Sequence, residues 1–287
     1  MATTRATTRS SFEQVGTRAV QTARDAVRNP WVERLARCGL AARGVVYAVI
    51  GVLAVQAAFF GRGKTTDTRG AIQEIAAESR PLLALVAAGL LGYALWRLVQ
   101  AVLDPEGKGH DAKGLAQRCA MLASGVTYAG LALAAVRALT AGPAAAGDGS
   151  GQAITASMLD KPFGRWVVAL VGLGVIASGL RQVAEVWRRS FEKKLLLSRM
   201  DANERRFAVR TGQIGFGARG VVFLLAGGFL VQAAVRYDAS RARGLRGALE
   251  ILAAQPHGTW LLGAVASGLI VFGAYCFLEA RYRRIIF

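Results

Sequence analysis

The chain has 287 residues, of which 53% are hydrophobic, and it carries a formal net charge of +18. This combination excludes an ordinary soluble domain, because so much apolar and basic content requires the two kinds of residue to be segregated along the chain. A nucleic-acid-binding protein would gather its basic residues on one folded face, whereas here they lie in short clusters between apolar stretches, so we expect no nucleic-acid partner.

Residues 1–30 form a basic, Thr- and Arg-rich segment without a continuous apolar stretch, so we expect no cleavable signal peptide. Phe12, Val15 and Ala19 recur at helical spacing with arginines among them. Two interpretations of this segment stay open. It forms an amphipathic helix along the inner leaflet, or its weak hydrophobicity leaves it disordered.

Six later stretches of about twenty residues are almost free of charge. Each is long enough to cross a hydrocarbon core of about 30 Å as a helix that rises about 1.5 Å per residue. A helix in a soluble bundle would show polar residues every third or fourth position, whereas "LLALVAAGLLGYALW" shows none before Arg97. The sequence therefore predicts an all-α integral membrane protein with six transmembrane helices, at residues 39–60, 82–103, 116–140, 164–187, 212–235 and 258–280.

Lysine and arginine are unevenly divided between the two sets of connections. Residues 1–38, 104–115, 188–211 and 281–287 hold 20 Lys or Arg against 9 Asp or Glu, whereas 61–81, 141–163 and 236–257 hold 9 against 7. Since cytoplasmic loops carry the excess of basic residues, both termini are predicted to be cytoplasmic. We expect a multi-pass protein of the bacterial plasma (inner) membrane whose cytoplasmic basic clusters contact anionic lipid headgroups.

The odd-numbered spans repeat one pattern. "ARGVVYAVIGVLAVQAA" from Ala42 recurs as "ARGVVFLLAGGFLVQAA" from Ala218, and a fainter copy, "ASGVTYAGLALAAVRAL", begins at Ala123. After each copy comes a segment that is predicted to be a short interfacial helix, followed by a proline at the start of the next span, Pro81, Pro162 or Pro256. Each unit has an even number of spans, so the sequence predicts three parallel two-helix repeats with pseudo-threefold symmetry. Their boundaries are set at residues 31–110, 111–195 and 196–287, within one membrane domain.

The pattern "ARGVVY" with a distal "VQAA", in three two-span repeats, resembles the bacterial membrane family catalogued as domain of unknown function 1206. The resemblance covers nearly the whole chain after residue 30 and is clearest in the first and third repeats. The second repeat departs from it, with Ser124 in place of the arginine and Arg137 in place of the glutamine. The resemblance implies a six-span inner-membrane protein, and it lends no catalytic or ligand residues.

Arg43 and Arg219 are expected about one turn inside the membrane, where a charge is costly and is usually paired. We expect Arg219 to pair with Glu279, Arg43 with Gln100, and Glu185 with Arg181 or a neighbouring repeat. The predicted intramembrane polar ring comprises Arg43, Arg219, Gln100, Glu185, Glu279, Arg97 and Arg181. Two interpretations stay open: a girdle of pairs that locks the helices together, or a ring about the axis that forms a cytoplasmic gate or anion-binding vestibule.

Two further sets of aligned residues are candidates. Gln56, Arg137 and Gln232 lie thirteen residues beyond the arginine position, about 20 Å toward the outside, and Arg137 is expected to snorkel to the outer interface. Gly44, Gly125 and Gly220 belong to a stripe of small residues that favours close helix packing.

Enzyme signals are weak, and we expect a non-enzymatic protein. The sequence contains no nucleophile elbow, phosphate-binding glycine loop or Cys-x-x-Cys motif, and we expect no cofactor and no metal site. Two functional hypotheses remain: a channel or transporter for an ion or small solute, and a non-transporting scaffold or regulatory protein that binds lipids, a protein partner or a second copy of itself.

Overall fold

The computed structural model describes residues 30–60, 65–104, 107–109, 111–147, 151–189, 191–192 and 195–283. The basic segment that precedes Pro30, with its expected amphipathic helix, lies outside these ranges. Within them the protein is all-α, with six long and three short α-helices. The long helices are α2 (Pro30–Phe59), α4 (Arg80–Leu103), α5 (Ala112–Ala141), α7 (Gly164–Arg188), α8 (Ala202–Arg236) and α10 (Gly258–Tyr282). The short ones are α3 (Thr68–Glu78), α6 (Gly151–Leu159) and α9 (Leu245–Ala254).

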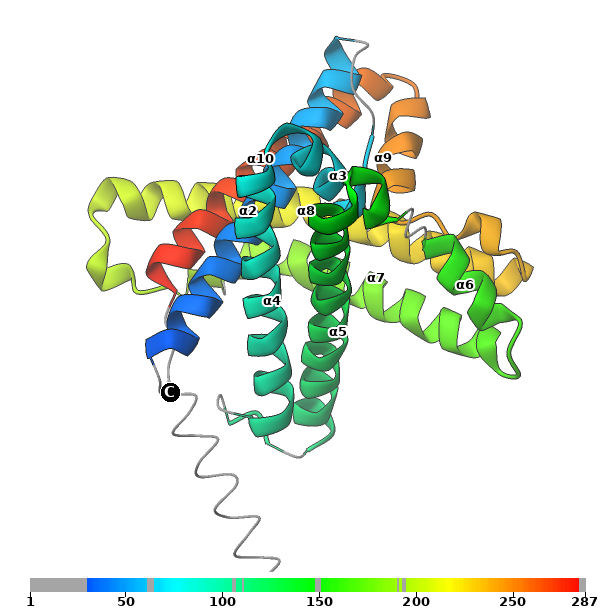
Figure 1. The fold of residues 1–287 in the computed structure, drawn as a ribbon, viewed down its shortest axis with the longest axis horizontal. Helices are drawn as coiled ribbons and strands as arrows, with labels where there is room; N and C mark the ends of the chain where they lie inside the picture. The colour runs from blue at the N-terminus through cyan, green and yellow to red at the C-terminus, as the bar shows by residue number, and fades with distance from the viewer. Residues whose placement is uncertain are drawn as a thin grey trace, which may run out of the picture.

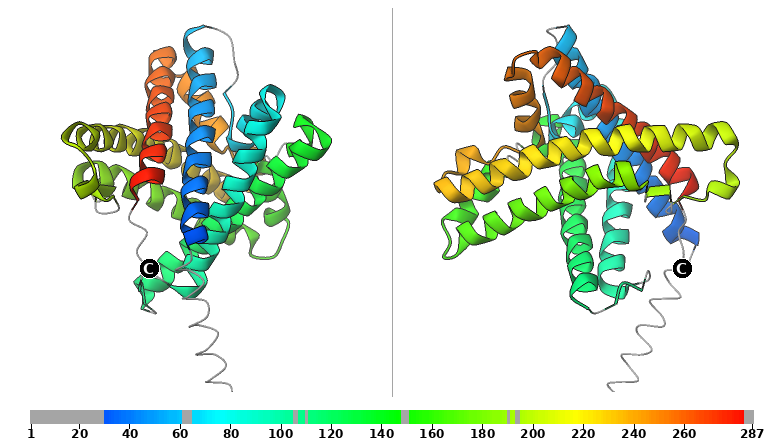
Figure 2. Two further views of the ribbon diagram at one scale, coloured as in Figure 1. Left: turned by 60° about the vertical axis from the view of Figure 1, so that its left-hand side comes forward. Right: turned by 180° about the vertical axis from the view of Figure 1, so that it is seen from behind.

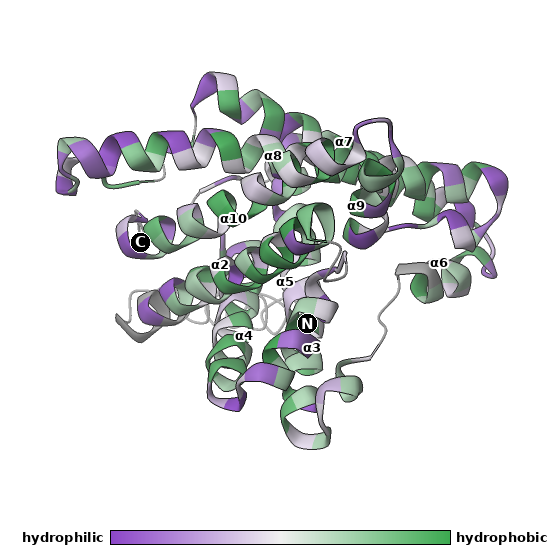
Figure 3. Cartoon of the chain, turned by 90° about the horizontal axis from the view of Figure 1, so that it is seen from above, coloured by the Kyte–Doolittle hydropathy of each residue, from purple (hydrophilic) through white to green (hydrophobic). Residues whose placement is uncertain are grey.

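All six long helices are long and apolar enough to cross a membrane, which confirms the prediction of six long apolar helices as candidate spans. Hydrophilic residues gather at their ends and in the connections, whereas their middle parts are mainly hydrophobic (Figure 3). Two boundaries differ strongly from the prediction, and α2 begins at Pro30, nine residues before its predicted span. The helix α8 begins at Ala202, ten residues before the predicted span, because Asp201 and Glu204 form a capping box that starts the helix within the basic segment.

The short helices lie between the two long helices of each expected repeat. Asp67 caps α3, since its carboxylate accepts hydrogen bonds from the main-chain N–H groups of Arg69 and Gly70. The first proline, Pro81, occupies the first turn of α4, as the sequence predicts. The interfacial position of these helices stays a prediction.

The other two prolines lie two residues before their helix and not in its first turn, although α7 and α10 begin at residues 164 and 258, as the predicted spans do. Phe163 and His257 follow them with φ of 64° and 62°, and α7 and α10 begin at the next residue, a glycine. A Cβ at Gly164 would lie 1.6 Å from the carbonyl oxygen of Met158 in the preceding short helix. Glycine is required there because the turn brings the two helices into backbone contact.

The long helices associate as three extensive pairs, α4 with α5, α7 with α8, and α10 with α2. The α4–α5 pair runs across the α7–α8 pair at a steep angle, and α2 and α10 take a third direction (Figures 1 and 2). Each pair joins the second long helix of one expected repeat to the first long helix of the next, and the α10–α2 pair joins the last to the first. The repeats are therefore linked to one another more extensively than the two helices within any one of them.

The predicted packing glycines lie at the centre of these pairs. A Cβ at Gly44 would lie 2.9 Å from the carbonyl oxygen of Gly273 on α10, and one at Gly220 would lie 2.9 Å from Cγ2 of Val183 and 3.2 Å from the carbonyl oxygen of Gly179 on α7. A Cβ at Gly125 would lie 2.8 Å from Leu98 on α4. The same position of the repeat thus makes a close approach in all three pairs.

A hydrogen bond is also repeated at corresponding positions of the three pairs. Arg118 on α5 donates to the carbonyl oxygens of Ala101 and Val102 on α4, at 2.8 and 2.9 Å. Arg37 on α2 donates in the same way to Ala280 and Arg281 on α10, and Gln213 on α8 donates to Val186 on α7 at 3.2 Å. These side chains satisfy carbonyl groups in the last turns of the even-numbered spans, which lack partners within their own helix.

Candidate functional site: an arginine and tyrosine cluster

Arg43 is a buried cation that reaches from α2 toward α4. Its side chain is only 7% exposed. Its Nη1 lies 3.5 Å from the hydroxyl oxygen of Tyr93, and its guanidinium carbon lies 4.9 Å from the ring centre of Phe272 on α10. Its Nε has no hydrogen-bond partner among the described residues. The positive charge is therefore held by an aromatic face and one long hydroxyl contact.

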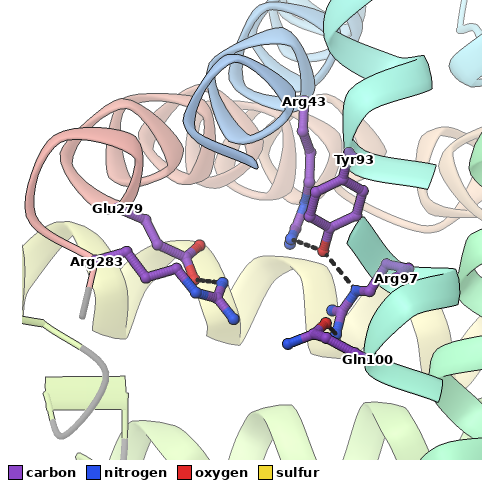
Figure 4. Close-up of polar contacts among 6 residues, drawn as sticks. All are labelled: Arg43, Tyr93, Arg97, Gln100, Glu279 and Arg283. Carbon is purple, nitrogen blue, oxygen red and sulfur yellow. Dashed lines mark hydrogen bonds and ion pairs between the residues drawn. The ribbon is translucent and has the colours of Figure 1, made fainter. Parts of the chain in front are cut away.

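Arg97 on α4 completes a short chain of polar contacts with the same tyrosine (Figure 4). Its Nε donates to the hydroxyl oxygen of Tyr93 at 3.0 Å, and its Nη1 donates to Oε1 of Gln100 at 3.2 Å. Because Tyr93 accepts from both arginines, two cations share one neutral hydroxyl group. The expected pairing of Arg43 with Gln100 is therefore wrong, because Arg43 contacts Tyr93 instead and Arg97 donates to Gln100.

Arg219 on α8 approaches Arg43 from another pair of helices. Its Nε donates to the hydroxyl oxygen of Tyr47 at 3.0 Å, and its guanidinium carbon lies 4.5 Å from the ring centre of Phe223 and 5.1 Å from that of Phe272. The guanidinium groups of Arg43 and Arg219 therefore both lie about 5 Å from the ring of Phe272. A cation–π contact favours each charge, while the two charges repel one another.

The expected ion pair between Arg219 and Glu279 is wrong. Glu279 is 5% exposed and accepts instead from Nη1 of Arg283, the residue that follows the end of α10, at 2.5 Å (Figure 4). The main-chain N–H of Arg283 also donates to the carbonyl oxygen of Glu279, so the i,i+4 spacing that brings side chains together is kept at the helix end. As a result, Arg43, Arg97 and Arg219 have no carboxylate partner among the residues that the structure describes.

The second repeat does not complete the predicted ring. Glu185 is buried on α7, but Arg181, four residues earlier, is exposed and makes no hydrogen bond or ion pair with any described residue. The expected pairing of these two side chains is therefore wrong.

The outer polar positions do not form a second site. Gln56, Arg137 and Gln232 are all exposed on three different helices. Exposure at the outer part of a span fits the expected snorkelling of Arg137.

Sequence reasoning missed the tyrosines that hold the cluster. Tyr47, Tyr93 and Tyr128 come from three helices, and the rings of Tyr93 and Tyr128 lie 4.6 Å apart in an edge-to-face contact. The available signal was the alignment of Tyr47, Tyr128 and Phe223 in the three copies, always one turn after the arginine position.

The comparisons with known proteins agree with this repeated architecture. The family model described as Domain of Unknown Function (DUF1206) matches residues 38–104, 120–189 and 214–283. The chain belongs to this family. The uncharacterized protein YxxB of Bacillus subtilis (strain 168) is 35% identical over 258 residues, which cover 88% of this chain and 92% of that protein. No solved structure matches the chain. Each of the three segments matched by the DUF1206 model lies within one expected repeat.

Two more buried polar atoms in this DUF1206 protein lack a hydrogen-bond partner among the described residues. They are Oε1 of Gln182 on α7 and the hydroxyl of Tyr275 on α10, and they add to Nε of Arg43. A buried polar group without a partner costs about 1 to 3 kcal/mol, so water or a polar solute at each position would be favourable. Nε of Arg43 and the hydroxyl of Tyr275 can donate to a bound anion, whereas Oε1 of Gln182 can only accept a hydrogen bond. Within the described ranges no group of three or more His, Cys, Asp or Glu side chains could hold a metal ion.

Proposed function

We propose that this protein binds a small anion at the arginine cluster and provides a pathway for anions across the bacterial plasma membrane. The observation that carries this proposal is the excess of positive charge: Arg43, Arg97 and Arg219 lie together within the spans and no described carboxylate neutralises them. Uncompensated charge inside a membrane is costly unless it faces water or a counter-ion. Arginine is also the side chain best suited to binding oxyanions through several N–H groups.

The proposal includes a topology that the repeated contacts support. The three repeats would be parallel, with both termini cytoplasmic, and related by a pseudo-threefold axis along the membrane normal, since corresponding residues make corresponding contacts in all three helix pairs. The arginines would then lie in the cytoplasmic half of the membrane. The basic connections would contact anionic headgroups, and no enzymatic activity is proposed.

The test is anion flux through proteoliposomes that contain the purified protein. We expect flux of chloride or phosphate in the wild type and a loss of at least tenfold in the Arg43→Gln, Arg219→Gln double variant. Arg137→Gln is the matched control, because it removes an arginine from the exposed outer part of a span. Loss of flux in both variants, or flux that the double variant does not change, would contradict the proposal.

A second candidate, a membrane scaffold, is favoured by a different observation. The guanidinium groups of Arg43 and Arg219 stack on Tyr47, Phe223 and Phe272, which come from three helices, so the same contacts also lock helices together. Under this hypothesis, folded wild-type protein carries no anion, and the double variant loses thermal stability without any change in flux.

A further inference from the structure

The two long helices of a repeat cross in close contact in the first and third repeats. In the first, a Cβ at Gly89 of α4 would lie 2.6 Å from Cβ of Ala42 on α2. In the third, a Cβ at Gly268 of α10 would lie 2.4 Å from Cβ of Ala218 on α8. These two crossings occur at corresponding residues and are closed.

The corresponding crossing in the second repeat is open. Gly174 on α7 and Ala123 on α5 align with the residues that meet elsewhere, yet a Cβ at Gly174 would meet nothing within 4 Å, and both residues are exposed. The helices α5 and α7 belong to different pairs and do not pack extensively on each other in the part of the chain that the structure describes. We call the surfaces that they leave uncovered, formed by Ala120, Ala123, Gly174, Ser178 and Arg181, the repeat-2 seam.

Sequence differences at the seam explain why it is open. Gly39 in the first repeat and Gly215 in the third are aligned, and both lie in close contact with the backbone of the helix that they cross. The second repeat has Ala120 at this position, which adds a methyl group. Small side chains at such a crossing set how closely the two helices approach.

The aromatic side chains of the other two crossings are also replaced. Tyr93 and Phe272 align with Ser178, which is exposed. Trp96 and Tyr275, which are 6% and 0% exposed, align with Arg181. Closing the seam would bury the Arg181 charge without a partner, at a cost of several kcal/mol.

We propose that the repeat-2 seam is a binding site for one phospholipid with an anionic headgroup. Arg181 and the hydroxyl of Ser178 would bind the phosphate, and the small residues Gly174, Ala123 and Ala120 would accept an acyl chain between the helices. Arg181 lies less than two turns from Trp187, which is 84% exposed near the cytoplasmic end of α7, where aromatic residues mark the membrane interface. The charge is therefore close enough to the headgroup region to meet a phosphate.

Charge argues against a second copy of the chain as the occupant. A twofold contact through the seam would bring Arg181 of one protomer near Arg181 of its partner, and like charges in a poorly solvated contact repel strongly. An anionic lipid supplies the opposite charge.

The experiment measures lipid binding to the full-length protein by native mass spectrometry, with phosphatidylglycerol and phosphatidylcholine as probes. We expect the wild type to bind phosphatidylglycerol at least tenfold more tightly than phosphatidylcholine. Arg181→Gln should lose this preference, whereas Arg181→Lys and the control Arg137→Gln should keep it. Ser178→Phe, which fills the seam but leaves the charge, should weaken the binding of both lipids.

Three results would overturn the proposal. The first is an unchanged lipid preference in folded Arg181→Gln protein. The second is a dimer whose two copies meet at the seam, as shown by a doubled mass and by a disulfide cross-link between the copies in the Ala177→Cys variant. The third is a disulfide within one chain between Ala123→Cys and Gly174→Cys that forms as readily as one between Ala42→Cys and Gly89→Cys, which would show that the seam closes on itself. None of these readouts depends on Arg43 or Arg219, so they test the lipid site separately from anion flux.

Discussion

The adjacent glycines Gly227 and Gly228 on α8 offer a sharp test of how tightly the helix pairs are packed. A Cβ at Gly227 would lie 2.7 Å from Cγ1 of Ile176 and 2.9 Å from the carbonyl oxygen of Gly172 on α7, whereas a Cβ at Gly228 would meet nothing within 4 Å. Real contacts of this kind begin near 3.4 Å. Gly227→Ala therefore forces α7 and α8 apart by about 0.5 Å, because backbone atoms on the facing helix have no rotamer with which to move away.

Overpacking of this kind costs about 1 to 3 kcal/mol, and we expect Gly227→Ala to destabilise the protein by that amount. Gly228→Ala introduces the same methyl group into open space, and the higher helix propensity of alanine makes it neutral or stabilising by up to about 1 kcal/mol. The assay is unfolding in mixed micelles of increasing SDS content, followed by circular dichroism, for the wild type and the two variants. Equal stability of the two variants would refute the assignment of Gly227 to the α7–α8 contact.

Three further predictions concern polar contacts. Arg118→Leu leaves two carbonyl groups at the end of α4 without their donor, so we expect about 1.5 to 3 kcal/mol of lost stability in the same SDS assay. Arg283→Ala removes the cation that lies 2.5 Å from the buried carboxylate of Glu279 and should cost about 3 to 5 kcal/mol, and adding Glu279→Gln should restore most of the loss in thermal unfolding. Hydrogen bonds from the hydroxyl and the main-chain N–H of Ser240 hold the pKa of Asp238 below its usual value, so their stabilising effect is complete above about pH 4 and is lost as the pH falls through the lowered pKa. Ser240→Ala should raise the pKa of Asp238, as measured by NMR titration of the labelled carboxyl group.

The membrane-spanning helices and their repetition could be predicted from the sequence because both depend on local features. A span is recognised by a stretch of about twenty residues without charge, and the repeats are recognised by "ARGVVY" and the similar segments in the other two copies. Neither signal requires any knowledge of tertiary contacts. The pairing of helices between repeats could not be predicted in this way. Gly44 belongs to a small-residue stripe whichever helix faces it, and only the structure identifies Gly273 as its neighbour.

The polar cluster was predicted in part for a similar reason. Arg43, Arg97 and Gln100 come together as their common depth suggests, whereas Glu279 pairs with Arg283, just beyond the end of its own helix. Alignment of the repeats gives the depth of a side chain in the membrane. It does not give the direction in which the side chain points, or the other residues that compete for the same partner. Hydrogen bonds to main-chain carbonyl groups, such as those of Arg118, leave no trace in the identity of the accepting residue, so sequence patterns do not reveal them.

Contact between α2 and α10 has a consequence for the order in which this protein is made. The first long helix to leave the ribosome packs most extensively against the last, and Arg37 donates to carbonyl groups that are synthesised more than 240 residues later. Until α10 enters the membrane, α2 must therefore stay there without its main partner, with the charge of Arg43 exposed to lipid or to the insertion machinery. The arginine cluster is then completed only when α10 arrives, because Phe272, on which both Arg43 and Arg219 stack, belongs to that helix.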